Sequence, residues 1–279
     1  MSVGAITFVG GGNMGAALVE GLIRAGESPS GITIVETSAD RRALLAEKFP
    51  GVTLVDSIGP CTAGVIAVKP AGAAAVCRDL SAAGATRVLS IAAGVSVETL
   101  QSAASGSTAV VRAMPNTPAL VGEGAAGICA SSRCSAADVE WAREVLGAVG
   151  VVVEVPESLI DAVTAISGSG PAYLFLVAEA MIDAGVAQGL PRDVADLLVR
   201  QLLVGSARLL QQTGEAPEDL RAKATSPNGV TAAAIEALEH AGLRSAITKT
   251  VEAAVRLTPA SSASIEPSEA NTATAIVKP

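Results

Sequence analysis

The sequence predicts an α/β N-terminal domain built on a mainly parallel sheet, followed by an all-α domain. In the first part of the chain, short apolar runs of strand length alternate with helical patterns. From residue 157 onward, long Ala- and Leu-rich stretches have a helical period and none has the pattern of a strand. The length of 279 residues also fits about two domains of ordinary size. We therefore expect one domain over residues 1–156 and a second over 157–257.

Short apolar runs in the first domain have the length and composition of buried strands. Helical patterns separate several of them, including residues 13–25 and a helix that follows the second strand through Phe49. Strands joined through helices imply crossover connections and a mainly parallel sheet whose two faces are both covered. The expected strands cover residues 5–10, 32–36, 65–69, 87–92, 109–114, 127–130 and 151–155.

Helices alone are expected in the second domain, over residues 171–188 and 192–213 and twice more between 229 and 256. The helix over 192–213 carries many large apolar residues and few charges. It is therefore either buried inside a monomer or completes its core with a partner chain. We expect the partner chain, and so a homodimer at least. The apolar residues concerned are Leu197, Leu198, Leu202, Val204 and Leu209.

The composition excludes several classes of protein. Lys and Arg number 19 against 27 Asp and Glu, which gives a net charge of −8, and aromatic residues make up 2% of the chain. An acidic chain with few aromatic side chains is poorly suited to nucleic acid. Four cysteines without a C-x-x-C pattern, together with a single histidine, do not provide the usual zinc site. We expect a small-molecule substrate, no nucleic acid and no metal.

The sequence also indicates a cytoplasmic protein. Few cysteines fit a reducing compartment, and the N-terminus begins with a strand pattern instead of a signal peptide. Glu179 and Asp183 interrupt the longest apolar stretch, so we expect no segment of the roughly 18 residues needed to span a membrane. Residues 258–279 are rich in Ser, Ala, Thr and Pro and are expected to be disordered.

A glycine-rich turn between the first strand and the first helix fits the pattern G-x-G-x-x-G. The first glycine permits the tight turn, the second lets the backbone approach a pyrophosphate, and the third lets helix and sheet pack closely. The free N–H groups at the start of the helix then face the anion. Because strand, turn, helix and second strand follow in the required order, we predict a Rossmann domain that binds a dinucleotide. The cofactor-binding residues expected here are Gly10, Gly11, Gly12, Asn13, Met14 and Gly15.

The end of the second strand bears on the choice between NAD and NADP and leaves it open. Glu36 stands where an acidic residue would bond the ribose 2′-hydroxyl of NAD. Ser38 follows, and Arg41 and Arg42 open the next helix, where they could hold the 2′-phosphate of NADP. The two arginines could equally form an ordinary solvated face of that helix.

Four further segments carry unusual Pro, Gly, Ser and Asn residues. Residues 68–70 (V-K-P) and 114–118 (M-P-N-T-P) end two expected strands, on the side where doubly wound sheets bind ligands. Residues 167–173 (S-G-S-G-P-A-Y) and 225–231 (T-S-P-N-G-V-T) open two helices of the second domain and are suited to bind a carboxylate. Each is an ordinary turn when taken alone, but their combination with a dinucleotide turn is specific.

These motifs make the sequence resemble the pyrroline-5-carboxylate reductase family over about residues 3–257. The resemblance rests also on F-V-G-G-G-N-M-G near the N-terminus, on V-R-A-M-P-N-T-P and on L-I-D-A-V-T-A-I-S-G-S-G-P-A-Y. It implies a Rossmann domain and an all-α dimerisation domain, in dimers that commonly assemble into larger rings. It also implies the reduction of 1-pyrroline-5-carboxylate to L-proline, the last step of proline biosynthesis, with NADPH or less often NADH. The substrate site would use both chains of a dimer.

The resemblance implies roles for individual residues. Ser38 would contact the 2′-phosphate, and Asn116 would lie near the nicotinamide. Thr231 is the expected catalytic residue, because the corresponding threonine donates a hydrogen bond at the ring nitrogen of the substrate. The nicotinamide half of the cofactor would be lined by Ala67, Val68, Lys69, Pro70, Ala92 and Ala93. The substrate-binding positions are Glu157, Ser226, Gly229, Val230 and Thr231.

Three departures from the family pattern bear on these roles. Asn228 replaces a glycine of the T-S-P-G-G-T-T motif, and asparagine tolerates positive φ better than most residues. Ala222 removes a carboxylate that the family usually has just upstream of this motif. The frequent N-R-S after the second strand is E-T-S here, which weakens the case for NADP.

The chemistry expected of such a site is hydride transfer to an imine carbon. A protonated cyclic imine is already electrophilic, so the protein supplies position and electrostatics and needs little acid–base machinery. The N–H groups of Gly229 and Val230 would bind the substrate carboxylate, with a hydroxyl added by Ser226. Thr231 would orient the ring nitrogen.

Two other functions fit parts of the sequence. A β-hydroxyacid dehydrogenase shares the early glycine turn and the domain order. It needs a catalytic lysine within G-x-x-x-K-x-x-x-N, however, and residues 165–190 contain no lysine. A redox-sensing protein that binds the dinucleotide without turnover would show a damaged loop over residues 225–231. Oxidation of NADPH and NADH with and without the imine distinguishes these alternatives.

Overall fold

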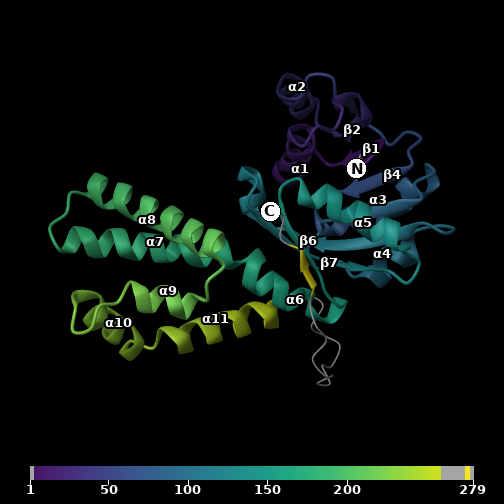
Figure 1. The fold of residues 1–279 in the computed structure, drawn as a ribbon. Helices are drawn as coiled ribbons and strands as arrows, with labels where there is room; N and C mark the ends of the chain where they lie inside the picture. The colour runs from purple at the N-terminus through teal and green to yellow at the C-terminus, as the bar shows by residue number, and fades with distance from the viewer. Residues whose placement is uncertain (1–2, 259–273, 277–279) are drawn as a thin grey trace. The chain divides into compact units, whose positions relative to one another are not determined.

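The computed structural model describes residues 3–258 and 274–276. These residues form two compact units, which are described separately (Figure 1). Unit 1 holds residues 3–169, part of the C-terminal helix over 254–258, and residues 274–276. Unit 2 is Gly170–Ala253.

Unit 1 is built on a single sheet. Its strands are β1 (Ile6–Val9), β2 (Ile32–Val35), β3 (Thr53–Val55), β4 (Ala63–Ile66), β5 (Arg87–Ser90), β6 (Ala109–Met114), β7 (Gly124–Ala130), β8 (Gly150–Glu154) and β9 (Thr274–Ile276). Within the described residues they lie in the order β3-β2-β1-β4-β5-β6-β7-β8-β9 (Figure 1). The strand order therefore reverses between β1 and β4, and doubly wound sheets bind ligands at such a point, beyond the carboxyl ends of the strands.

The sheet is mainly parallel, which confirms the fold class predicted from the sequence. In the part of the sheet from β3 to β6, each pair of neighbouring strands is parallel. β7 runs antiparallel to β6, with Met114 opposite Gly127. Because the connection over residues 115–123 holds only the short 3-10 helix η2 (Thr117–Val121), it lacks the longer crossover that a parallel return requires. β8 is parallel to β7 and antiparallel to β9.

Three details of the sheet differ from the expected strands. β3 is a short edge strand that the sequence pattern did not indicate. β4 starts at Ala63 and ends at Ile66, because Pro70 begins the next helix and residues 67–69 leave the sheet. β9 lies within the tail expected to be disordered, residues 258–279; apart from this strand and Thr258, that tail lies outside the described residues.

Helices cover both faces of the sheet, as crossover connections require. They are α1 (Asn13–Arg24), η1 (Pro29–Gly31), α2 (Ala39–Lys48), α3 (Pro70–Ala82), α4 (Val97–Ala103) and α5 (Ala136–Gly147). On one face, Leu18 of α1, Leu45 of α2 and Val145 of α5 join the larger apolar core. On the other face, Cys77 of α3 and Leu100 of α4 join a second core. The carboxyl ends of the central strands are thus held between two packed layers.

The segment that follows β8 also belongs to unit 1. It consists of η3 (Glu157–Leu159), α6 (Ile160–Val163) and the π-helical turn η4 (Thr164–Gly168). Ile160 and Ala165 are fully buried, and a Cβ added at Gly127 of β7 would meet the side chain of Val163 at 2.8 Å. The compact units consequently divide after Ser169, beyond the domain boundary predicted at residue 156.

Unit 2 contains helices alone, and the structure describes all of its residues. The helices are α7 (Gly170–Ala187), α8 (Arg192–Thr213), α9 (Pro217–Lys223), α10 (Val230–His240) and α11 (Leu243–Leu257), whose last residues belong to unit 1. Only Ala195 and Val199 of α8 are buried in this unit. The five apolar residues from Leu197 to Leu209 that predicted a partner chain are all exposed. Unit 2 thus leaves much of its apolar surface uncovered in a single chain.

The helical run Glu157–Ala187 is long and apolar enough to cross a membrane by length and composition, so the expectation that no such segment exists was wrong. The run remains apolar enough despite the charged residues Glu179 and Asp183. The first part of the run, however, holds the fully buried Ile160 and Ala165 and packs in the core of unit 1. Its exposed second part, α7, has the apolar surface that a helical interface between two chains also requires.

Candidate functional site

The glycine turn joins β1 to α1 at the reversal of strand order. Gly10 has a φ of 108°, a left-handed conformation that favours glycine, and its N–H donates to the carbonyl of Val35 at 2.9 Å. Gly12 is the N-cap of α1 and has no side chain that could occupy the first amides of the helix. The turn therefore points the unpaired N–H groups of a helix N-terminus out of the carboxyl end of the sheet.

The space around the three motif glycines tests whether a dinucleotide fits. A Cβ at Gly10 would collide with the carbonyl oxygen of Ala67, and a Cβ at Gly15 would collide with that of Gly10. A Cβ at Gly12 would meet no atom within 4 Å. The first and third glycines thus permit close backbone packing, while the second borders open space. This is the arrangement that a pyrophosphate requires, so the residues present fit a nicotinamide dinucleotide.

Glu36 lies directly over this turn. One of its carboxylate oxygens accepts from the N–H of Gly11 at 3.1 Å, and the other accepts from the N–H of Ser38 at 3.0 Å. Arg41 donates through Nε to the carbonyl of Gly11 at 2.9 Å, and Arg42 donates to the carbonyl of Glu36 at 2.6 Å. A carboxylate and two guanidinium groups are therefore gathered beside the glycine turn, where the sequence predicts the adenosine ribose. The carboxylate faces the turn itself.

The loops after β4 and β5 form the other side of the strand-order reversal. The N–H of Ala67 donates to the carbonyl of Val9 at 2.8 Å, which ties the first loop to β1. The N–H of Ile91 donates to the carbonyl of Ile66 at 3.1 Å, and the buried hydroxyl of Ser90 accepts from the N–H of Ala92 at 3.3 Å. Residues 67–70 and 92–93, which are expected to line the nicotinamide half, are thus brought together at the carboxyl ends of β4 and β5.

The side chain of Asn116 forms hydrogen bonds with two backbone groups of the protein. Its Nδ2 donates to the carbonyl of Ser167 at 3.0 Å, and its Oδ1 accepts from the N–H of Ala125 at 2.8 Å. The residue is buried, and it joins the end of β6 to the start of β7 and to η4. Asn116 therefore fixes three segments near the site. Its contact with a nicotinamide stays a prediction.

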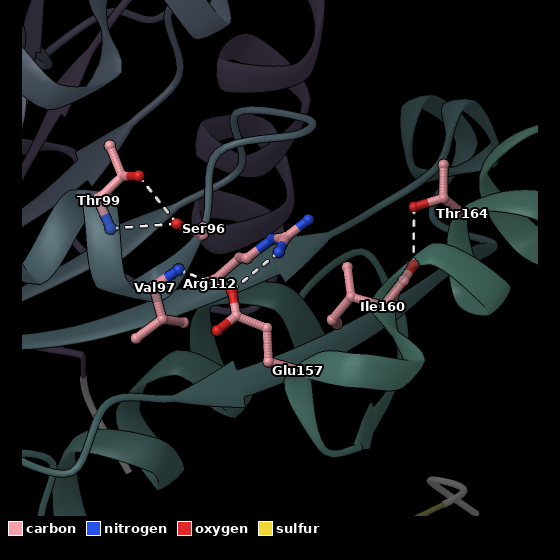
Figure 2. A network of polar contacts seen from close by, with 7 residues as sticks. All are labelled: Ser96, Val97, Thr99, Arg112, Glu157, Ile160 and Thr164. Carbon is pink, nitrogen blue, oxygen red and sulfur yellow. Dashed lines mark hydrogen bonds and ion pairs between the residues drawn. The ribbon is translucent and has the colours of Figure 1, made fainter. Parts of the chain in front are cut away.

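Glu157 is held by a residue that sequence reasoning missed. Its Oε1 accepts from Nη1 of Arg112 at 2.9 Å and from the N–H of Val97 at 2.7 Å, as Figure 2 shows. Arg112 comes from β6, and its side chain is only 2% exposed. The available signal was a lone arginine among apolar residues in V-V-R-A-M. The predicted substrate-binding role of Glu157 is not tested by these contacts.

The remaining predicted residues lie in unit 2, at the start of α10. Gly229 is the N-cap of this helix, and a Cβ on it would collide with the hydroxyl of Ser226. Asn228 has a φ of 56°, so it adopts the left-handed conformation expected of a residue that replaces glycine. Val230 and Thr231 are exposed. The N–H of Gly229 donates to the carbonyl of Ser226 at 3.0 Å. The loop therefore presents the first amides of α10, together with the hydroxyls of Ser226 and Thr231, at a helix N-terminus.

The thiols nearest these elements are poor candidates for chemistry. Burial raises the pKa of the Cys77 thiol to about 11 and, with the nearby Glu157 carboxylate, that of Cys129 to about 12. Both therefore stay protonated and unreactive at neutral pH. Within the part of the chain that the structure describes, there is no group of three or more His, Cys, Asp or Glu side chains that could hold a metal ion.

The open space at Gly12 leads to a prediction for Gly12→Asp. Aspartate is a good N-cap, so the thermal midpoint should stay within about 2 °C of the wild-type value. Its charge would occupy the place of the pyrophosphate, so the dissociation constant for NADPH should rise at least about tenfold. Isothermal titration calorimetry and thermal unfolding measure the two effects. Gly59→Asp, in open space on another loop, is the matched control and should bind as the wild type does.

Comparisons with known proteins cover both parts of the chain. The family description "Pyrroline-5-carboxylate reductase dimerisation" matches residues 157–259, and "NADP oxidoreductase coenzyme F420-dependent" matches residues 5–94. The helical part therefore carries the dimerisation domain of the first family, which accounts for its uncovered apolar surface. The match to the dimerisation family begins at residue 157, where the predicted second domain also begins.

Relatives and solved structures agree with these matches. A pyrroline-5-carboxylate reductase of Corynebacterium melassecola is 41% identical over 89% of this chain and 95% of its own length. The pyrroline-5-carboxylate reductase of Pseudomonas aeruginosa is 40% identical over 91% of this chain and 95% of its own length. A structure of the Coxiella burnetii reductase has a TM-score of 0.86 with 36% identity, over 91% of this chain and 97% of the other. The Plasmodium falciparum enzyme, solved with NADP bound, has a TM-score of 0.77 with 29% identity, over 92% and 97%. The chain belongs to the pyrroline-5-carboxylate reductase family.

Proposed function

We propose that this protein reduces 1-pyrroline-5-carboxylate to L-proline with NADPH, or with NADH as the alternative cofactor. It would thereby catalyse the last step of proline biosynthesis. The observation that carries the proposal is the continuous similarity to reductases of that name, which spans both the glycine turn and the helical half. The NADP-bound relative supports the same class of cofactor here.

On the cofactor side, the residues of this chain bind and orient. The open face of Gly12 and the first amides of α1 receive the pyrophosphate. Ser38, the N-cap of α2, contacts the 2′-phosphate. Residues 67–70 and 92–93 line the nicotinamide half, beside Asn116. When bound, the cofactor supplies the hydride. Holding it against the substrate in attack geometry is worth up to roughly 7–11 kcal/mol of the barrier.

On the substrate side, the start of α10 binds the carboxylate and orients the ring. The N–H groups of Gly229 and Val230 and the hydroxyl of Ser226 receive the carboxylate of the imine, for which the Gly229 N–H exchanges the carbonyl of Ser226 for the substrate. Thr231 is the catalytic residue. Its hydroxyl donates a hydrogen bond to the ring nitrogen as the hydride reaches the carbon of the protonated imine and the C=N electron pair becomes a lone pair on that nitrogen. Glu157 completes the set of substrate-binding positions.

The working molecule is a homodimer, which we propose to assemble further into a ring of dimers in the cytoplasm. The dimerisation domain and the exposed apolar residues of α7 and α8 support the dimer. We propose that the functional domains are 1–156 and 157–257. Each substrate site would then combine a Rossmann domain with helices supplied by the dimer.

The first experiment measures oxidation of NADPH and NADH by the purified protein, with and without 1-pyrroline-5-carboxylate. We expect absorbance at the nicotinamide band to fall only when the imine is present, and L-proline to form in equal amount. Tight NADPH binding without turnover would instead indicate a dinucleotide sensor. Absence of both binding and turnover in a folded protein would contradict the proposal.

Glu36→Gln is expected to shift cofactor use toward NADPH. The carboxylate repels a 2′-phosphate at the adenosine ribose, and removing about 1 kcal/mol of repulsion should lower KM for NADPH about fivefold. KM for NADH should rise or stay unchanged, because the amide bonds a 2′-hydroxyl less strongly than a carboxylate does. Steady-state kinetics with both cofactors measure the ratio. Glu47→Gln removes the same charge from an exposed site on α2 and should leave the ratio unchanged.

Thr231→Val removes the hydroxyl and keeps the shape of the side chain. We expect kcat/KM for the imine to fall by roughly ten- to a hundredfold, in line with the loss of one positioned donor. KM for NADPH should stay within about twofold, since the hydroxyl is proposed to act on the substrate alone. Thr231→Ser, which keeps the hydroxyl, should retain most of the activity. Equal activity of the Val and Ser variants would show that the hydroxyl has no catalytic role.

A further inference from the structure

The buried guanidinium of Arg112 stands on the face of β6 that packs toward α4 and η3. Its neighbours on that face include the small apolar cluster of Val97, Cys129, Val155 and Ile160. A positive charge in such surroundings destabilises the fold unless a partner compensates it. An apolar residue would fill the same space without this cost, so packing alone does not explain why an arginine stands here.

Glu157 provides the compensating charge by direct contact. The Cys129 thiol stays neutral because burial raises its pKa to about 12. The charge of Arg112 also lowers the pKa of the Asp161 carboxyl, but burial has the larger effect and raises that pKa. Within the described residues, the buried Oδ1 of Asp161 has no hydrogen-bond partner. Arg112 forms its ion pair with Glu157, at 2.9 Å. The orientation of the Glu157 carboxylate is therefore set by Arg112.

The same carboxylate oxygen anchors a loop of the cofactor site. Residues 91–96, which we call the nicotinamide loop, connect β5 to α4. The start of this loop is tied to the sheet through the hydroxyl of Ser90. Its end is tied by the 2.7 Å bond from the N–H of Val97 to Oε1 of Glu157. In Figure 2 the Glu157 carboxylate lies between Arg112 and the backbone of Val97.

We propose that Arg112 is a positioning residue, which acts through Glu157 to hold the nicotinamide loop in place for hydride transfer. The inference rests on the proposed function, because that function places the nicotinamide beside Ala92 and Ala93. Because its side chain is only 2% exposed, Arg112 would act through Glu157 and not by direct contact with cofactor or substrate. A buried ion pair that links β6, η3 and the start of α4 would place this loop more accurately than backbone bonds alone.

The test uses Arg112→Met in the full-length protein. Loss of the guanidinium leaves Glu157 free to turn toward solvent, so hydrogen exchange at the Val97 amide should become at least about tenfold faster. The kcat with NADPH should fall by roughly ten- to a hundredfold, because the nicotinamide is misplaced. The dissociation constant of ADP should stay within about twofold, since ADP carries the adenosine and pyrophosphate half but no nicotinamide. A merely structural role would weaken ADP binding together with activity.

Two further variants sharpen the result. Arg112→Met combined with Glu157→Gln has no unpaired buried charge, and its neutral amide can still accept from the Val97 N–H. This double variant should recover most of the exchange protection, and it remains available if the single variant fails to fold. Asp161→Asn removes a different carboxylate near the same guanidinium. It should leave both Val97 exchange and kcat within about twofold of the wild type.

Two outcomes would overturn the proposal. One is unchanged exchange at Val97 and unchanged kcat in a folded Arg112→Met protein. The other is a loss of ADP binding in parallel with activity, which would reveal general loosening of unit 1. If the wild type itself fails to reduce 1-pyrroline-5-carboxylate, the proposed function is wrong. In that case Val97 exchange and ADP binding by the Arg112→Met variant still decide whether Arg112 holds the nicotinamide loop.

Discussion

The close backbone contact between the turn after β1 and the end of β4 is the constraint on which the cofactor site depends. Gly10 lies against the carbonyl of Ala67, and Gly15 lies against Gly10, at distances that admit no Cβ. This contact brings the N-terminus of α1 to the place where the strand order reverses. Gly12 then borders open space beside a row of unpaired amides. The anion site is therefore a consequence of packing, and no charged side chain is needed to create it.

Polar side chains then join the loops around this site to the sheet. Glu36 bonds the glycine turn, Asn116 bonds β7 and η4, and Glu157 bonds the start of α4. Each of these side chains bonds backbone groups of a distant segment. Such contacts are costly to break when buried, because the freed group loses its partner without gaining water. The precision of the site thus derives from side chains that serve the protein's own backbone.

The helical unit 2 leaves much of its apolar surface exposed in a single chain. In unit 2, Gly170–Ala253, only two residues are buried in a single chain, although α7 and α8 are rich in large apolar side chains. Without a partner, this surface would remain in contact with water at a cost that scales with its apolar area. The match to a dimerisation domain explains the pattern, because the missing core is completed between chains. Exposed apolar helices therefore need no membrane to account for them here.

Local patterns in the sequence determined the parallel strands other than β3, the helices over 13–24 and 192–213, and the glycine turn. These features depend on residues close together in the chain, so hydrophobic period and turn chemistry are sufficient to predict them. Tertiary structure alone decided the reversed direction of β7, the packing of residues 157–169 on the sheet, and the partnership of Arg112 with Glu157. The last pair is separated by 45 residues and meets only because β6 and η3 pack together. A lone arginine in a strand carries no local sign of its partner, since burial and pairing arise from long-range packing.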